Sequence, residues 1–84
     1  MNQMLMHDAR KLFHSGMITA ARVCPVEFEP DKYFIQIDAT APIIEQYGNE
    51  ITRQRGGRRV FATIDGAATT IRDIGFRRFE VVTD

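Results

Sequence analysis

Two stretches of the chain repeat their apolar positions with the period of a helix. In the first, residues 3–15, the spacing places the apolar side chains on one face of an amphipathic helix. We expect Asn2 to cap this helix and Gly16 to end it, because glycine readily adopts the left-handed conformation that closes a helix. The apolar positions are Leu5, Ala9, Leu12 and Phe13.

The second helical stretch lies nearer the carboxyl end. Asp65 is predicted to cap it and Gly75 to close it. Phe76 follows this glycine, where a Schellman motif commonly places an apolar side chain against the last turn, so we expect it to contact Ile71. The apolar positions on the predicted inner face are Ile64, Ala68, Ile71 and Ile74.

Three other stretches are typical of strands. Residues 17–29 lack helical spacing, and Pro25 in their midst predicts a bend or an interruption, because proline cannot donate a hydrogen bond to a sheet. The proline and aspartate within residues 29–32 predict a turn. Residues 33–38 alternate between two faces as a second strand would, and residues 76–82 do the same for a final strand.

Two segments in the middle of the chain are less regular. Residues 40–48 fit a short helix that stops at a glycine, and they fit a loop almost as well. After them, two β-prone pieces, residues 50–54 and 59–63, flank Gly56-Gly57. A glycine pair is among the favoured connections of a β-hairpin, so this segment is predicted to be one.

Together these elements predict an α+β domain. We expect a small antiparallel sheet of about five strands, with an N-terminal helix and a second helix before the last strand, both packed on one face of the sheet. A chain of 84 residues, of which 44% are hydrophobic, buries roughly 60–65% of its unfolded surface, which is enough for one modest core. Residues 1–84 are therefore predicted to form a single domain.

Composition also bears on where the protein works. No apolar run approaches the length of about 20 residues that a membrane span requires. The first residues lack the basic stretch and apolar block of a secretory signal. Cys24 is the only cysteine, so an intramolecular disulfide is impossible, and a cytoplasmic location without membrane contact is the expectation.

The charged residues are balanced overall but segregated along the chain. Eleven Lys and Arg face eleven Asp and Glu, which gives no formal net charge. Residues 23–50 hold one basic and six acidic side chains, a net charge of −5, whereas residues 53–78 hold seven arginines and two acidic side chains, a net charge of +5. This separation predicts directed contacts rather than a general affinity for polyanions.

The arginines of the predicted hairpin are the main candidates for binding. A two-stranded ribbon of this kind can enter a DNA major groove or lie along a phosphate backbone. Alternatively, the arginines pair with the acidic segment of the same molecule or of a neighbouring subunit, and overall neutrality favours this reading because it weakens attraction to DNA. The candidate residues, including two arginines before the last strand, are Arg53, Arg55, Arg58, Arg59, Arg77 and Arg78.

No other group of residues indicates catalysis, a cofactor or a metal. His7 and His14 share a helix face but lie about 10 Å apart along its axis, which is too far to share a metal ion. Cys24 lies in an apolar stretch, where a buried and inert thiol is the common case. Gly56-Gly57 lacks the spacing and the lysine of a P-loop. We therefore expect a protein that is not an enzyme and has no small-molecule substrate.

Residues 52–81 run from a glutamine-arginine-glycine turn to an arginine-phenylalanine strand, an aspartate-capped alanine-rich helix, a glycine and a closing strand. This segment resembles the ParC family of small plasmid-encoded, partition-associated proteins, which is unrelated to the topoisomerase subunit of that name. The N-terminal stretch DARKLFHSGMITAARVCP is also similar, whereas residues 40–51 are longer than the family's usual link. The matching positions are Gln54, Arg55, Gly56, Arg59, Phe61, Asp65, Ala67, Ala68, Ile74, Gly75 and Val81.

The resemblance implies an accessory role in the maintenance of a bacterial plasmid, through DNA or through the partition proteins. Two functions follow as hypotheses. The first is a non-catalytic protein-interaction module of a plasmid or other mobile element, which docks on another protein or on itself as a homodimer. The alternative is a DNA-binding regulatory or partition factor that uses the arginine-rich hairpin.

Overall fold

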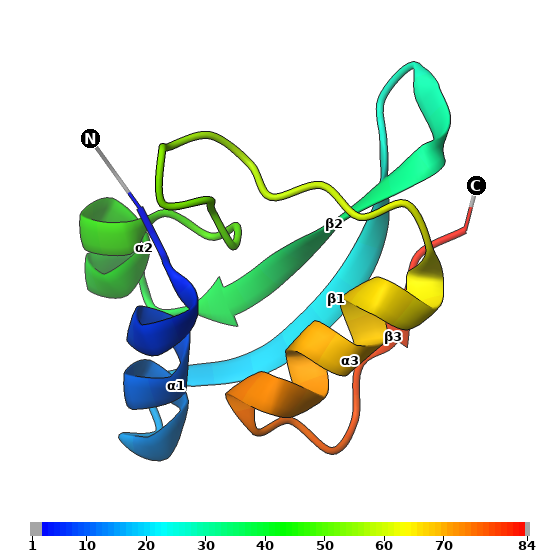
Figure 1. Ribbon diagram of the computed structural model, residues 1–84. Coiled ribbons are helices and arrows are strands. Elements are labelled where there is room, and N and C mark those ends of the chain that lie inside the picture. The colour runs from blue at the N-terminus through cyan, green and yellow to red at the C-terminus, as the bar shows by residue number, and fades with distance from the viewer. Residues whose placement is uncertain (1–2, 84) are drawn as a thin grey trace.

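The computed structural model describes residues 3–83 and confirms the α+β class (Figure 1). Three helices and three strands follow one another along this part of the chain. In order, they are α1 (Met6–His14), β1 (Ile18–Val26), β2 (Glu29–Ala39), α2 (Ala41–Tyr47), α3 (Ile64–Ile74) and β3 (Glu80–Val81). None of these helices is long and apolar enough to cross a membrane.

Helix α1 is shorter than predicted but ends where the sequence indicates. It begins at Met6, and the carboxylate of Asp8 accepts a hydrogen bond of 3.1 Å from the amide of Leu5, which satisfies one of the free donors at the helix start. Asn2, the expected cap, lies outside the described residues. Gly16 follows the helix with a φ of +75°, so the predicted glycine stop is confirmed.

Helix α3 has the predicted end and a different cap. The hydroxyl of Thr63 accepts a hydrogen bond of 2.9 Å from the amide of the third helical residue, so Thr63 is the cap and the prediction of Asp65 is wrong. Threonine precedes the first helical residue and has the extended backbone that a cap requires, whereas Asp65 already lies inside the first turn. Gly75 closes the helix as predicted, and the amide of Phe76 donates to the carbonyl of Ile71 at 3.3 Å.

Strands β1 and β2 form a long antiparallel hairpin whose turn differs from the prediction. The turn expected at residues 29–32 is wrong, because β2 already begins at Glu29 and the chain reverses through Phe28, whose φ is +65°. The pairing of the strands shifts beyond Pro25, so three residues of β2, including Pro30, bulge away from β1. A bulge tolerates proline because its residues make no ladder hydrogen bonds.

The sheet has three strands in the order β2-β1-β3, fewer than the five expected. It is also mixed rather than antiparallel, because the short β3 pairs parallel with β1, with Arg22 opposite Glu80 and Val23 opposite Val81. A parallel neighbour is reached here because the chain crosses from one edge of the sheet to the other through α3.

The segment expected to supply two further strands instead covers the free edge of β2. Residues 51–53 and 57–59 pair in a short antiparallel hairpin, with a bridge between Thr52 and Arg58 and a bond of 3.0 Å from the amide of Arg59 to the carbonyl of Ile51. Other backbone groups of the segment bond to β2: the amide of Ile51 donates to the carbonyl of Ile35 at 3.2 Å, and Tyr33 and Phe61 exchange bonds of 2.9 and 2.8 Å. The predicted hairpin around Gly56-Gly57 is therefore present, but it is short and lies against β2 instead of forming two regular strands of the sheet.

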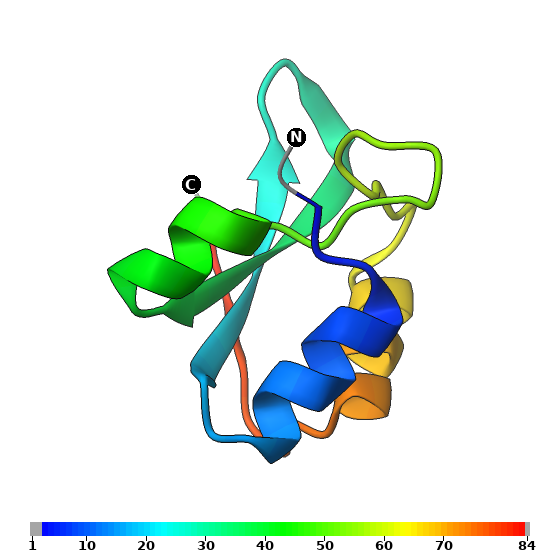
Figure 2. The ribbon, with the colours of Figure 1, turned by 90° about the vertical axis from the view of Figure 1, so that its left-hand side faces the viewer.

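Helices α1 and α3 lie side by side on one face of the sheet, and α2 lies apart from them (Figure 2). The sequence fits both a helix and a loop at residues 40–48, and the structure has a helix that ends at Gly48. The core fills the space between the sheet and the two larger helices. Its buried residues are Met4, Ala9, Leu12, Ile18, Ala21, Val23, Ile35, Ile37, Ile51, Ala67, Ile71, Ile74 and Phe76.

Candidate functional site

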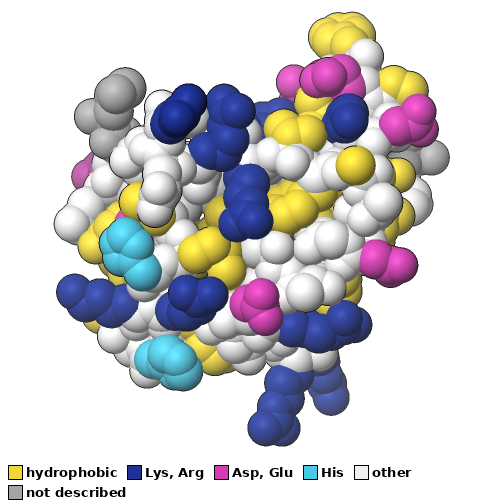
Figure 3. Space-filling view, viewed as in Figure 1, with side chains coloured by type: hydrophobic (Ala, Val, Ile, Leu, Met, Phe, Trp, Pro, Cys, Tyr) yellow, Lys and Arg dark blue, Asp and Glu magenta, His cyan; other side chains and the backbone are white. Residues whose placement is uncertain are grey.

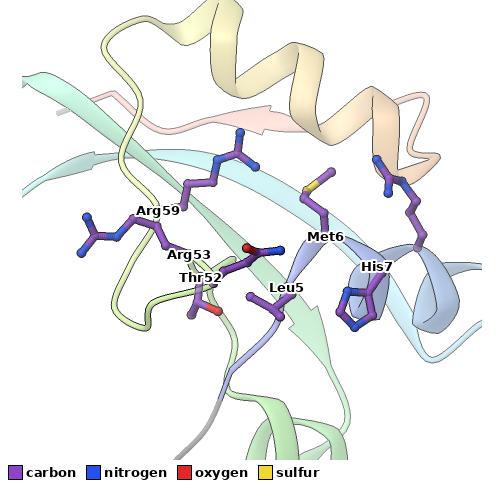
Figure 4. Close-up of a pocket in the computed structure, with 8 residues that line it drawn as sticks. Leu5, Met6, His7, Thr52, Arg53 and Arg59 are labelled. Atoms are coloured by element: carbon purple, nitrogen blue, oxygen red, sulfur yellow. The ribbon is translucent and has the colours of Figure 1, made fainter.

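A depression of about 500 Å³ lies between the start of α1 and the turn at residues 52–59 (Figure 4). We call it the basic depression. Its size is within the range of about 300–1,000 Å³ that is common for ligand pockets in proteins. The lining residues are Leu5, Met6, His7 and Arg10 on the side of α1, and Thr52, Arg53, Gln54 and Arg59 on the side of the turn.

Two hydrogen bonds hold the walls of the basic depression together. The amide of Thr52 donates to the carbonyl of Met4 at 2.9 Å, and the amide of Met4 donates to the hydroxyl of Thr52 at 3.1 Å. Met4 is fully buried, so this anchor is fixed by the core. The turn itself is closed by a bond of 3.0 Å from the amide of Arg53 to the carbonyl of Gly57, whose φ of +81° suits glycine.

The basic depression contains three arginines and no carboxylate. Within residues 3–83, no Asp or Glu oxygen lies within 4.0 Å of a side-chain nitrogen of Arg10, Arg53 or Arg59. Arg10 donates from Nε to the carbonyl oxygen of Asp73 at 3.3 Å, which orients its stem but leaves its charge unpaired. The site is therefore electropositive and suited to an anionic group.

The three arginines occupy different parts of the depression. Arg59 extends from the turn into the space beside Met6, and its guanidinium carbon lies 5.1 Å from the centre of the Phe61 ring (Figure 4). Arg53 is exposed, and its side chain points away from Leu5 and Met6, with a terminal nitrogen close to Gly57 (Figure 4). An anion that enters the depression would meet Arg59 inside and Arg53 at the edge.

Arg58, which precedes Arg59 in the sequence, stabilises the fold and is not part of the basic depression. Its Nε and one terminal nitrogen donate to the two carboxylate oxygens of Glu50 at 3.1 and 2.9 Å. Its guanidinium carbon also lies 3.7 Å from the centre of the Phe34 ring. The hydrogen bonds to Glu50 raise the pKa of Arg58, so its charge is permanent but already balanced within the chain.

The other predicted binding residues are not part of the basic depression. Arg55 lies exposed in the turn itself. Arg77 and Arg78 are exposed in the link between α3 and β3, at the opposite end of the molecule from residues 52–59 (Figures 1 and 2). The structure thus brings together Arg53 and Arg59 of the six predicted residues and adds Arg10 to them.

Acidic and basic side chains gather on different parts of the surface. In the view of Figure 3, Lys and Arg side chains cluster over the turn at residues 52–59, and Asp and Glu side chains surround the tip of the β1–β2 hairpin at the upper right. On this face of the molecule, the acidic hairpin tip and the basic turn therefore lie apart, although Glu50 and Arg58 pair elsewhere.

The face of the sheet opposite the helices carries a second charged group. Arg22 donates to both carboxylate oxygens of Asp38 at 2.7 and 2.6 Å and to the amide oxygen of Gln36 at 3.2 Å. These bonds raise the pKa of Arg22 and lower the pKa of Asp38. Both charges are satisfied on neighbouring strands, so this group stabilises the hairpin and leaves no free site for a ligand.

Cys24 is buried beside this group, with its sulfur 3.9 Å from the amide oxygen of Gln36. Burial raises the pKa of the thiol, which keeps it protonated and unreactive at neutral pH. We expect the folded protein to react with the disulfide reagent DTNB about tenfold or more slowly than the protein in denaturant. Absorbance at the released thionitrobenzoate band measures this, and equal rates would show that the thiol is accessible.

The two histidines form no site of their own. His7 lies at the rim of the basic depression, mostly exposed and with Nε2 3.3 Å from a carboxylate oxygen of Asp8. His14 is exposed and its ring meets the edge of Phe13. In the described part of the chain, no three His, Cys, Asp or Glu side chains come together as a metal would require.

Arg10 and His7 are the site residues that the sequence reasoning missed. Their spacing of three places them on one face of α1, a signal that could have grouped them. What the sequence does not contain is the contact between this face and the turn at residues 52–59, which depends on the bonds between Met4 and Thr52.

Comparison of the chain with protein-family models, with curated proteins and with solved structures finds no match.

Proposed function

We propose that the protein is a non-catalytic interaction module whose basic depression receives an acidic segment of a protein partner. One observation carries the proposal: three arginines without a carboxylate partner line a depression that also contains the apolar residues Leu5 and Met6. The adjacent Arg58, by contrast, is already neutralised by Glu50. Arginine forks bind carboxylates with paired hydrogen bonds, and the apolar residues suit a side chain that lies next to them.

A polypeptide fits the basic depression better than DNA does. The segment that would have formed a DNA-reading ribbon lies against β2, and its Arg58 is turned toward Glu50. The remaining arginines line a depression that also contains Leu5 and Met6, and apolar side chains there suit a polypeptide better than a phosphate backbone. The chain also has no net charge, so long-range attraction to DNA is weak.

The proposed setting is the cytoplasm of a bacterium, as an accessory protein in the maintenance or partition of a plasmid or other mobile element. This part of the proposal is supported by the resemblance of residues 52–81 to the ParC family of partition-associated proteins. In such a setting, the partner would present an acidic segment with an apolar residue to the basic depression.

Fluorescence anisotropy can test the proposal with two labelled probes, a peptide of alternating glutamate and phenylalanine and a short DNA duplex. We expect saturable binding of the peptide to the full chain. The double variant Arg53→Glu/Arg59→Glu should weaken it by about tenfold or more, because it removes two charge-assisted hydrogen bonds and adds two repulsive charges. The matched control is Arg77→Glu/Arg78→Glu, which makes the same change in charge outside the depression and should bind the peptide nearly as wild type does.

Two outcomes would contradict this function. If the duplex binds more tightly than the peptide, with affinity falling by a log-log slope of about −0.9 per phosphate contact as salt rises, the DNA-binding alternative replaces it. If the peptide does not bind, or if both double variants weaken it equally, the basic depression is not a receptor for an acidic segment.

A further inference from the structure

The tip of the β1–β2 hairpin displays an aromatic side chain that the fold does not use. The side chain of Phe28 is fully exposed, and its φ of +65° is a backbone conformation that glycine adopts easily and bulky residues rarely adopt. Strain of this kind persists where a residue has a role beyond packing, and here no packing offsets it. The tip therefore has the character of a contact point for another molecule.

The surroundings of Phe28 are acidic. Glu27 and Glu29 flank it, both exposed, and Asp31 follows in the bulge of β2. None of these three carboxylates has a basic nitrogen within 4.0 Å in residues 3–83. The hairpin projects from the body of the molecule, with a hydrophobic side chain at its end and acidic side chains below it (Figures 1 and 3).

The tip and the basic depression are complementary in chemistry. The depression offers the apolar residues Leu5 and Met6 for an aromatic ring, and its volume of about 500 Å³ exceeds that of one phenylalanine side chain. Arg53 and Arg59 line the same depression and supply positive charge for the carboxylates that flank such a ring, and arginine also stacks favourably on aromatic rings. Each surface supplies what the other lacks.

We propose that the tip of one copy, residues 27–29, docks into the basic depression of a second copy, so that the chain associates with itself head to tail. This inference rests on the proposed function, and it identifies the acidic segment that the depression receives as the hairpin tip of a second copy. The two surfaces differ, so the contact is heterologous, and copies add to one another until a ring closes or the chain of molecules ends. The contact area is small, so association should depend strongly on protein and salt concentration.

Sedimentation velocity of the full chain over a range of concentrations tests the inference. At low salt, the wild-type protein is expected to form species larger than a monomer, and high salt should dissociate them. The variant Phe28→Gly should remain a monomer. Glycine relieves the backbone strain at this position, so its thermal midpoint should equal or exceed that of the wild type. Loss of association therefore cannot result from unfolding.

A mixture of two variants gives the decisive sedimentation experiment. Phe28→Gly keeps the basic depression but removes the aromatic end of the tip, and Arg53→Glu/Arg59→Glu keeps the tip but reverses two arginines of the depression. Each alone should be monomeric. Mixed in equal amounts, they should form a complex with the mass of two chains, because one intact tip then meets one intact depression and growth stops there.

The results separate this inference from the function on which it rests. A wild-type protein that stays monomeric at every concentration and still binds the glutamate-phenylalanine peptide overturns self-docking but leaves the receptor intact. Association that survives in Phe28→Gly, or a mixture that stays monomeric, overturns it as well. Failure of the peptide to bind instead overturns the proposed function.

Discussion

An alanine in place of Gly75 is expected to lower the free energy of unfolding by about 3 kcal/mol, from left-handed backbone strain and overpacking together. Gly75 closes α3 with a φ of +133°, which only glycine adopts without strain. A Cβ atom there would lie 2.6 Å from two ring carbons of Phe13. This ring packs at its edge against Phe76, at a centroid distance of 4.6 Å, so it cannot simply move aside. Urea denaturation followed by circular dichroism measures the loss.

Gly16→Ala is the matched control for this variant. Gly16 also has a positive φ, +75°, but a Cβ atom there would meet nothing within 4 Å. This variant should lose only about 1 kcal/mol in the free energy of unfolding, from backbone strain alone. Equal losses in the two variants would mean that the contact with Phe13 contributes nothing.

Ile71→Ala is the second large effect, with an expected loss of about 3–4 kcal/mol in the free energy of unfolding. Ile71 is fully buried in the core between α3 and the sheet, together with Val23 and Ile35. Truncation removes the transfer free energy of the side chain and leaves a cavity that close-packed neighbours cannot fill. The midpoint of urea denaturation should fall while the slope stays constant, since the same surface is exposed on unfolding.

Ile44→Ala serves as the comparison for the core variant. Ile44 has the same side chain but is 37% exposed on α2, a helix without buried residues. Its truncation should change the stability by less than about 1 kcal/mol. A loss at Ile44 as large as that at Ile71 would place α2 in the stabilising core, contrary to the structure.

The helices are the part of the fold that the sequence predicts well, because their signals are local. The apolar spacing around Leu12 and Ile71 identifies the buried faces, and Gly16 and Gly75 mark the ends. A period of 3.6 residues and a residue that tolerates positive φ are both properties of a short window. The cap of α3 was missed by two positions because Thr63 and Asp65 are both good capping residues.

The strand pairing could not be predicted in the same way, because it depends on partners far apart in the chain. Residues 50–54 and 59–63 form only a short hairpin, and other backbone groups of this segment bond to β2. The parallel pairing of β3 with β1 involves residues almost sixty positions apart, such as Arg22 and Glu80. No local signal distinguishes these alternatives, since they differ in long-range contacts and in loop closure.

The candidate site also depends on long-range contacts, so it too could be predicted only in part. The basic character of residues 53–59 is visible in the sequence, but the division of roles among the arginines is not. Arg58 is not available to a ligand because it contacts Glu50 and Phe34 in the fold. Arg10 lines the basic depression because α1 is anchored to the turn. The separation of charge was the most useful signal, because the acidic hairpin tip and the basic turn lie apart on the face shown in Figure 3.

The covering of β2 by residues 49–61 also protects the protein from aggregation. β2 is the longest strand, with eleven residues, and its outer edge would otherwise offer unpaired amides and carbonyls to strands of other molecules. The ion pair between Glu50 and Arg58 joins the two arms of the covering segment. The opposite edge is left to β3, which has only two residues and carries the charge of Glu80. Over residues 33–37, the outer edge of β2 is thus closed to strands of other molecules.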